Sequence, residues 1–167
     1  RGKKLVEYYG VTTRPTTDRV KENVFNLLSN YLNFNGIRVL DLFAGTGAIS
    51  FEFASRGATP VHAIEMNALH VSVLRKNVEA LGLQKTVQVV RNNVFDFLGI
   101  CHARYDLIFA DPPYDLDQLD ALPEKVFQAN ILKEGGQFIL EHPDSYHFDN
   151  HPFFLKERKY GNVHFTF

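Results

Sequence analysis

The chain has 167 residues, of which 45% are hydrophobic and 22% are charged. This length is typical of one domain, and the composition excludes a wholly disordered or collagen-like protein. No run of about 18 apolar residues occurs and no apolar segment follows the basic start, so neither a transmembrane helix nor a secretory signal is predicted. Because Cys101 is the single cysteine, no internal disulfide can form, and we expect a reducing, cytoplasmic location.

The net charge is −1, but the charges are unevenly distributed. Residues 1–25 carry six bases and three acids, whereas residues 106–150 carry ten acids and two bases. A protein that binds a polyanion over its whole surface would be strongly basic, and this one is not. A basic end beside an acidic middle can still orient a charged partner, although solvated loops would give the same pattern.

The first predicted element is a helix that follows Pro15. Its apolar positions recur at spacings of 4, 3 and 4, as on one helix face: Val20, Val24, Leu27 and Tyr31. Either Thr16 or Thr17 can serve as its N-cap.

Strands and helices then alternate along the chain. Short apolar runs predict strands over residues 37–42, 61–65, 86–90, 105–110 and 137–141. Helices are predicted over residues 48–56, 68–81 and 118–130. Gly57 and Gly82 end the first two of these helices, and Asn67 caps the second. A closing hairpin is predicted from residues 153–155 and 163–167 around Gly161.

This alternation predicts an α/β fold with a doubly wound, mostly parallel sheet and a C-terminal antiparallel hairpin. No repeat or linker divides the chain, so residues 1–167 are expected to form a single domain. Ligands of such sheets bind at the carboxyl ends of the strands, which is where two motifs lie.

The first motif, residues 41–47, joins the first strand to its helix with the sequence Asp-Leu-Phe-Ala-Gly-Thr-Gly. Gly45 and Gly47 permit a tight turn and a close approach of a ligand, and the free N–H groups of the next helix suit an anion. Glu65, at the end of the second strand, is placed to accept the hydroxyls of a ribose. The alternative is an ordinary strand-to-helix turn with Glu65 as a surface acid.

The nature of the cofactor follows from two residues of this region. Ser50 stands where the fingerprint of NAD-binding proteins has its third glycine. Asp41 would repel a pyrophosphate but suits a ligand with an ammonium group. S-adenosylmethionine, an amino acid joined to adenosine, therefore fits the motif better than a dinucleotide.

The second motif is Asp111-Pro112-Pro113-Tyr114, at the end of the strand over residues 105–110. The two prolines make a stiff corner that offers acceptors only, the Asp111 carboxylate and the Pro112 carbonyl. A planar amino group with two hydrogens is the matching ligand, and Tyr114 can lie flat against a base beside it. A simple proline turn that leaves a strand is the alternative.

With these motifs the chain resembles the S-adenosylmethionine-dependent methyltransferases of amino groups, which share an Asp/Asn-Pro-Pro-Tyr/Phe motif. Within them it resembles the bacterial guanine-N2 methyltransferases of small-subunit ribosomal RNA, because residues 1–5, residues 14–22 and Phe25-Asn26 match their N-terminal signature. The resemblance implies a Rossmann-like methyltransferase fold over residues 1–167, in which a basic segment of about residues 1–16 precedes the core.

The resemblance also implies roles for individual residues. Residues 41–47, among them Asp41, Phe43, Gly45, Thr46 and Gly47, would bind the methionine part of the cofactor. Glu65 would hold the ribose and Met66 would pack on the adenine. Asn93, followed by Val94, stands where relatives commonly have an acid that contacts the adenine amine; an asparagine keeps an acceptor oxygen but loses the charge.

For the reaction, the resemblance implies that Asp111 and Pro112 bind the guanine amine while Pro113 shapes the corner and Tyr114 stacks on the base. The RNA-binding residues would be basic or polar and lie near the start of the chain: Arg1, Lys3, Lys4, Arg14, Thr16 and Arg19, with Lys21 beside them. The expected partner is small-subunit RNA within a partly assembled subunit, bound by a monomer without a membrane or a metal.

Several alternatives remain open. A DNA adenine or cytosine methyltransferase shares both motifs but normally needs a further domain to recognise its target. A protein-glutamine methyltransferase usually has Asn in place of Asp111, and a non-catalytic nucleotide-binding module would not need the proline corner. His147 and His151 have no evident third metal ligand and fit a solvated loop, and Cys101 fits a packing role.

Overall fold

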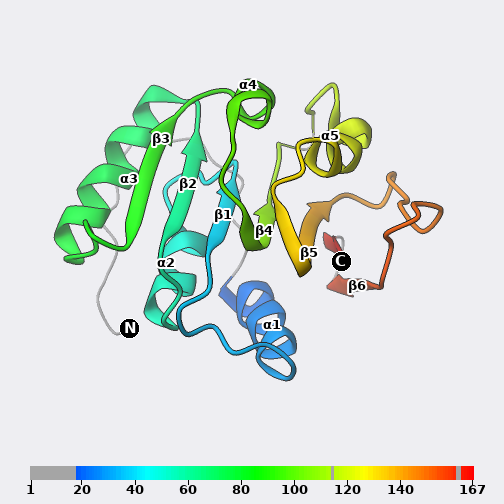
Figure 1. The fold of residues 1–167 in the computed structure, drawn as a ribbon, viewed down its shortest axis with the longest axis horizontal. Helices are drawn as coiled ribbons and strands as arrows, with labels where there is room; N and C mark the ends of the chain where they lie inside the picture. The colour runs from blue at the N-terminus through cyan, green and yellow to red at the C-terminus, as the bar shows by residue number, and fades with distance from the viewer. Residues whose placement is uncertain (1–17, 114, 161–162) are drawn as a thin grey trace.

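The computed structural model describes residues 18–113, 115–160 and 163–167. Within them, one seven-stranded sheet has the order β3-β2-β1-β4-β5-β7-β6 (Figure 1). The strands are β1 (Val39–Leu42), β2 (Val61–Glu65), β3 (Val87–Arg91), β4 (Tyr105–Ala110), β5 (Leu132–His142), β6 (Glu157–Tyr160) and β7 (Val163–Thr166). The helices are α1 (Asp18–Ser29), α2 (Ala48–Ser55), α3 (Ala68–Ala80), α4 (Val94–Ile100), the 3-10 turn η1 (Leu119–Ala121) and α5 (Leu122–Gln128).

The first five strands pair in parallel, and the last two complete the sheet as an antiparallel hairpin. The predicted doubly wound sheet with a C-terminal hairpin is therefore confirmed. Strand order reverses between β1 and β4, which are neighbours although two strands and three helices separate them in the chain. In open α/β sheets, ligands bind at this switch point, outside the carboxyl ends of the strands.

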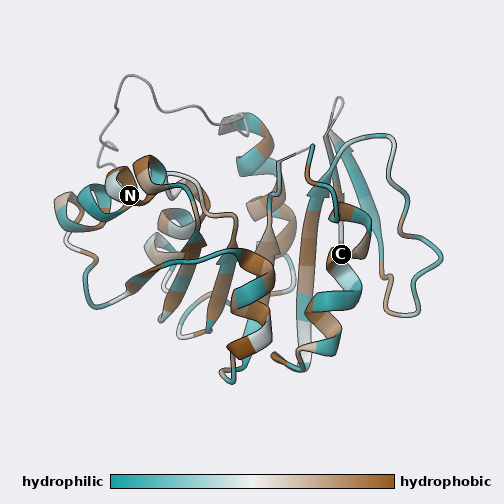
Figure 2. Cartoon of the chain, turned by 90° about the horizontal axis from the view of Figure 1, so that it is seen from above, coloured by the Kyte–Doolittle hydropathy of each residue, from teal (hydrophilic) through white to brown (hydrophobic). Residues whose placement is uncertain are grey.

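Alternating residues of each strand feed two separate cores, because successive side chains of a strand point to opposite faces. Val39 of β1 packs with apolar side chains of α1, α2 and α3, whereas Leu40 packs with those of α4 and α5. Figure 2 shows the result from above, with brown hydrophobic strands between two layers of helices of mixed colour. The central strands β1 and β4 are thus buried on both faces of the sheet.

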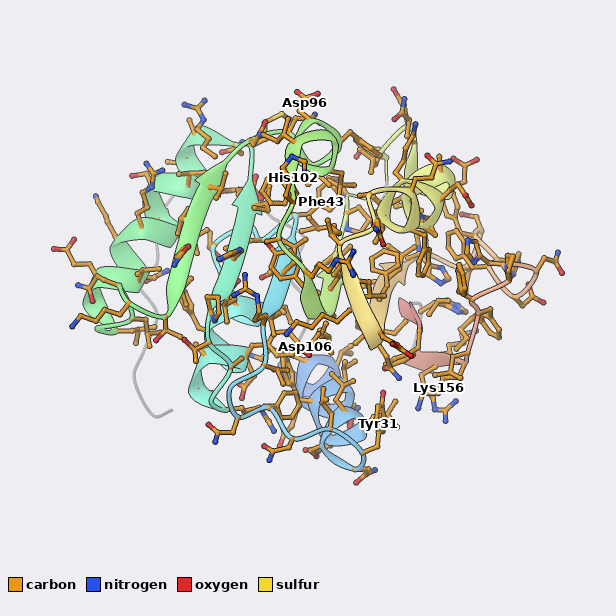
Figure 3. All side chains as sticks on the ribbon, viewed as in Figure 1. Tyr31, Phe43, Asp96, His102, Asp106 and Lys156 are labelled. Atoms are coloured by element: carbon orange, nitrogen blue, oxygen red, sulfur yellow. The ribbon has the colours of Figure 1, made fainter. Side chains whose placement is uncertain are left out.

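Helix α1 packs into the core on the same face of the sheet as α2 and α3. Its buried residues Val24, Phe25 and Leu28 follow the spacing of a single apolar helix face. Tyr31 was predicted on that face but follows the end of the helix and is 47% exposed. Its hydroxyl donates to Gln137 Oε1 at 3.0 Å, and Lys156 Nζ lies 4.5 Å from its ring centre (Figure 3).

Some elements differ from the sequence-based prediction. Helix α4 was not predicted, because its seven residues are too few to display a helical period. Strand β5 starts five residues early, and its register against β4 shifts between Tyr105 and Leu107. The first strand of the hairpin is the charged segment Glu157–Tyr160 rather than residues 153–155. Charged residues are common on such an edge strand because they discourage pairing with another chain. Strands were predicted from apolar runs, and this charged segment contains none.

In the described part of the chain, no helix combines the length and apolar character needed to cross a membrane.

Candidate functional site

A cavity of about 600 Å³ opens at the carboxyl ends of β1, β2 and β4. Its volume lies in the range of small-molecule sites. Both sequence motifs contribute to its wall: Asp41, Phe43, Gly45 and Thr46 from the first, and Asp111, Pro112 and Pro113 from the second. Because Leu42 pairs with Ala110 in the sheet, the chain leaves β1 and β4 side by side at this point. The fold thus joins two motifs that are about 70 residues apart in sequence.

The turn after β1 depends on unusual backbone conformations. Gly45 and Gly47 have φ angles of 59° and 101°, in the region that favours glycine. A Cβ atom on Gly47 would lie 2.4 Å from Leu74 Cδ1 and 2.6 Å from Phe51 Cε2. Gly47 does not line the cavity, so its role in the structure is to let α2 and α3 pack closely behind the turn.

Phe43 also has a positive φ, of 60°. This conformation is strained for a bulky residue, and such strain is concentrated at ligand sites. The ring packs partly against the core beneath α4, where Figure 3 labels it. The next residue fixes the turn to the neighbouring strand, because Ala44 N donates to Ile64 O at 2.9 Å.

Asp41 is the buried acid of the cavity, with 1% of its surface exposed. It accepts a hydrogen bond of 2.6 Å from Ser50 Oγ. The pKa of Asp41 is raised to about 7, chiefly by burial; the nearby Asp111 and Glu65 carboxylates contribute to the increase, and the hydrogen bonds from Ser50 oppose it. A carboxyl with this pKa exchanges its proton near neutrality, and a cation beside it would hold it ionised.

Glu65 connects the end of β2 to the glycine turn. Its Oε1 accepts from Gly45 N at 2.8 Å, and its Oε2 accepts from Asn67 N at 2.9 Å. His70 Nδ1 lies 3.7 Å from the same Oε2. A carboxylate has about four acceptor positions, so these contacts leave room for further donors from a ligand. The side chain is therefore held in place for such a ligand before it binds.

Asn93 caps helix α4, which the sequence analysis did not anticipate. Its Oδ1 accepts from Phe95 N at 2.9 Å and from Asp96 N at 3.2 Å. Its Nδ2 faces the exposed Met66, with 3.7 Å to the sulfur. Asn93 Oδ1, the atom expected to accept a hydrogen bond from a bound adenine, thus already accepts hydrogen bonds from the first turn of α4. Asn93, Met66 and Val94 all line the cavity.

Solvent exposure differs among the residues of the proline corner. Pro112 is buried, Asp111 is half-buried, and Pro113 is exposed. The carbonyl of Pro113 accepts from Leu116 N at 3.0 Å, which turns the following segment back toward the cavity. Tyr114 lies outside the described residues.

Some lining residues were not predicted as part of this site: Lys21, Ala48, Ile49, Asn67, His70, Phe95 and Leu116. The sequence had grouped Lys21 with RNA-binding bases, because the position of α1 over the sheet cannot be read from a local pattern. Of the predicted RNA-binding residues, Arg19 is exposed on α1. The others lie outside the described residues: Arg1, Lys3, Lys4, Arg14 and Thr16.

The weaker candidates have structural surroundings of their own. In the part of the chain that the structure describes, no three His, Cys, Asp or Glu side chains form a group that could hold a metal ion. His151 stacks on Phe127 with ring centres 5.3 Å apart, so it is not on a freely solvated loop. Cys101 is half-buried against the core beneath α4 and α5.

Comparison with known proteins adds independent information. Residues 1–167 match the model of a family described as "Conserved hypothetical protein 95". The chain is 37% identical over 145 residues to a "Putative rRNA methyltransferase YlbH" of Bacillus subtilis, covering 85% of this chain and 78% of that one. It is 32% identical over 144 residues to a "Ribosomal RNA small subunit methyltransferase D" of Haemophilus influenzae, covering 84% and 74%.

Comparison with solved structures identifies similar folds. The fold superimposes with a TM-score of 0.85 on a hypothetical protein of Thermus thermophilus, at 31% identity over 99% of this chain and 92% of that one. A putative methyltransferase of Escherichia coli matches with a TM-score of 0.83 and 28% identity, over 99% and 90%. These matches confirm the predicted Rossmann-like methyltransferase fold.

Proposed function

We propose that this chain, which belongs to the family described as "Conserved hypothetical protein 95", transfers a methyl group from S-adenosylmethionine to the exocyclic amine of a guanine in small-subunit ribosomal RNA. Several of the relatives to which the chain is similar are named as small-subunit ribosomal RNA methyltransferases. The observation that carries the proposal is the shared cavity. The acid-ended glycine turn after β1 and the acceptor-only corner after β4 line one space of about 600 Å³.

The cavity residues fit the chemical groups of the cofactor. The buried Asp41 suits the ammonium group of the methionine part, because a cation removes the cost of ionising an acid there. Glu65 offers its remaining acceptor positions to the ribose hydroxyls. Met66 and Val94 supply apolar surface for the adenine beside Asn93. When bound, S-adenosylmethionine supplies an activated methyl group on its sulfonium.

The corner after β4 would bind the second reactant, the guanine of the RNA. A guanine amine is a weak nucleophile, because its lone pair is delocalised into the ring. Hydrogen bonds from that amine to the Asp111 carboxylate and the Pro112 carbonyl would stabilise the positive charge that develops on nitrogen. Asp111 can then accept the proton that leaves. Tyr114 would stack on the base, which must be turned out of its helix or lie in a single strand.

The charge near the corner after β4 bears on whether the substrate is protein-free RNA or a particle that contains ribosomal proteins. Asp115, Asp117 and Asp120 are exposed on the segment after the proline corner, so this rim repels phosphates. We therefore propose that the substrate is a partly assembled small subunit, in which basic ribosomal proteins face the acidic rim. Protein-free RNA methylated at an equal or higher rate than the particle would refute this preference.

The substrate class is tested by methyl transfer from labelled cofactor to RNA, DNA and protein in separate reactions. We expect label in small-subunit RNA alone. Label in DNA would indicate a DNA amino-methyltransferase, and label in protein would indicate a protein-glutamine methyltransferase. Cofactor binding without transfer to any of the three would indicate a nucleotide-binding module.

A further inference from the structure

Lys21 occupies an unusual place on helix α1. It lies three, four and seven residues before Val24, Phe25 and Leu28, which are all buried, so the helical period places it on the same face. Arg19, two positions earlier, is exposed, whereas Lys21 is half-buried and lines the cavity. A lysine on the buried face of a helix keeps its ammonium group at the edge of the apolar surface, which here is the cavity.

The charges of the cavity make this lysine distinctive. Three carboxylates line the wall: Asp41, Glu65 and Asp111. Among the described lining residues, Lys21 is the one lysine or arginine. The carboxylates of the wall therefore favour a cationic ligand, and Lys21 on α1 is the charged group of opposite sign.

The proposed cofactor carries charges of both signs on its methionine part, an ammonium and a carboxylate on the same carbon. Asp41 suits the ammonium, but the three acids of the wall would repel the carboxylate. A carboxylate brought into a partly buried site costs free energy unless a cation or N–H donors meet it. Lys21 is the charged side chain that can do so.

We infer that Lys21 binds the carboxylate of the cofactor's methionine part and so fixes the amino-acid end of the ligand against Asp41. This inference rests on the proposed function, because it takes S-adenosylmethionine as the ligand. It assigns to α1, an element outside both sequence motifs, a role in selecting an amino-acid cofactor over a plain nucleoside. The competing role is a contact with an RNA phosphate, as the sequence alone suggested for Lys21.

The test measures binding of two ligands by calorimetry. S-adenosylhomocysteine carries the ammonium and the carboxylate, and its decarboxylated analogue keeps only the ammonium. For Lys21→Met we expect affinity for S-adenosylhomocysteine to fall by roughly 10- to 100-fold, the usual effect of losing a charge-assisted hydrogen bond. Affinity for the decarboxylated analogue should stay at or above that of the unchanged protein. Lys21→Arg should recover part of the loss.

Arg19→Met is the matched control, because it removes a positive charge from the exposed side of the same helix and should leave both affinities unchanged. Equal losses of both ligands in Lys21→Met, or no loss of S-adenosylhomocysteine, would overturn the inference. A lowered RNA affinity with unchanged S-adenosylhomocysteine affinity would assign Lys21 to a phosphate instead. If the unchanged protein bound neither ligand, the proposed cofactor would fail and the inference with it.

Discussion

At the scale of single residues, the buried Asp41 couples stability to function. Its pKa of about 7 lies above the ordinary value of 3.8, so the folded state favours the protonated form. The corresponding stability is present below pH 4 and is lost as the pH rises toward 7. An ionised Asp41 in the ligand-free protein is therefore a cost, which a bound cation would relieve.

The variant Asp41→Asn tests this coupling. Because the amide cannot ionise, we expect its free energy of unfolding at pH 8 to exceed that of the unchanged protein by roughly 2–4 kcal/mol. The difference should shrink as the pH falls to 4, and binding of S-adenosylhomocysteine should weaken at pH 8. Chemical denaturation at several pH values provides the measurement. A pH-independent difference would mean that Asp41 does not carry the shifted pKa.

Glu65 is expected to act on both the ligand and the turn. We expect Glu65→Ala to weaken binding of S-adenosylhomocysteine by roughly 1–3 kcal/mol, because ribose hydroxyls lose their acceptors. Thermal unfolding should also occur at a lower temperature, because the N–H groups of Gly45 and Asn67 lose their partner. Calorimetry and a melting curve measure the two effects. Unchanged affinity would show that Glu65 only supports the turn.

At the scale of elements, the sequence identified those whose pattern is local. The bounds of β2 and β4 agree with the prediction to the residue, because an acidic residue marks the end of each: Glu65 is the last residue of β2 and Asp111 follows β4. Helix α4 was missed for lack of length, and β6 because its charged residues pair at an edge. Glu65 and Asp111 could be predicted as site residues from their places at strand ends. Lys21 could not, because its place in the cavity wall depends on how α1 docks.

The packing of α2 and α3 behind the turn leads to a paired prediction. Gly47→Ala should destabilise the protein by more than Gly36→Ala, although both glycines have positive φ angles of 101° and 78°. A Cβ on Gly36 meets open space, so only the backbone strain of about 1 kcal/mol applies there. At Gly47 the new atom also collides with Leu74 and Phe51. Equal losses in chemical denaturation would contradict this account of Gly47.

At the scale of the whole molecule, we expect the opposed charges of residues 1–25 and of the acidic rim to determine where RNA binds. Exposed acids follow the corner after β4, so attraction to phosphates is expected to come from elsewhere, and residues 1–25 carry six bases. Each phosphate that a base neutralises releases counterions, which makes binding sensitive to salt. The protein is thus expected to bind RNA phosphates beside the cavity rather than at the corner after β4.

Replacing Lys3, Lys4 and Arg14 by alanine tests this arrangement. The logarithm of RNA affinity should depend less steeply on the logarithm of salt concentration, by about one unit of slope for each phosphate that is no longer neutralised. Affinity for S-adenosylhomocysteine serves as the control and should not change. The same slope as in the unchanged protein would place the RNA-binding face away from the N-terminal segment.

In the proposed function, the corner after β4 directs a methyl group to a guanine amine. The most direct measurement is identification, by mass spectrometry, of the methylated nucleoside in small-subunit particles treated with the protein and with Asp111→Asn. We predict N2-methylguanosine with the unchanged protein and almost none with Asp111→Asn, although both should bind S-adenosylhomocysteine. A methyl group on another nucleobase, or equal product from the variant, would contradict the account.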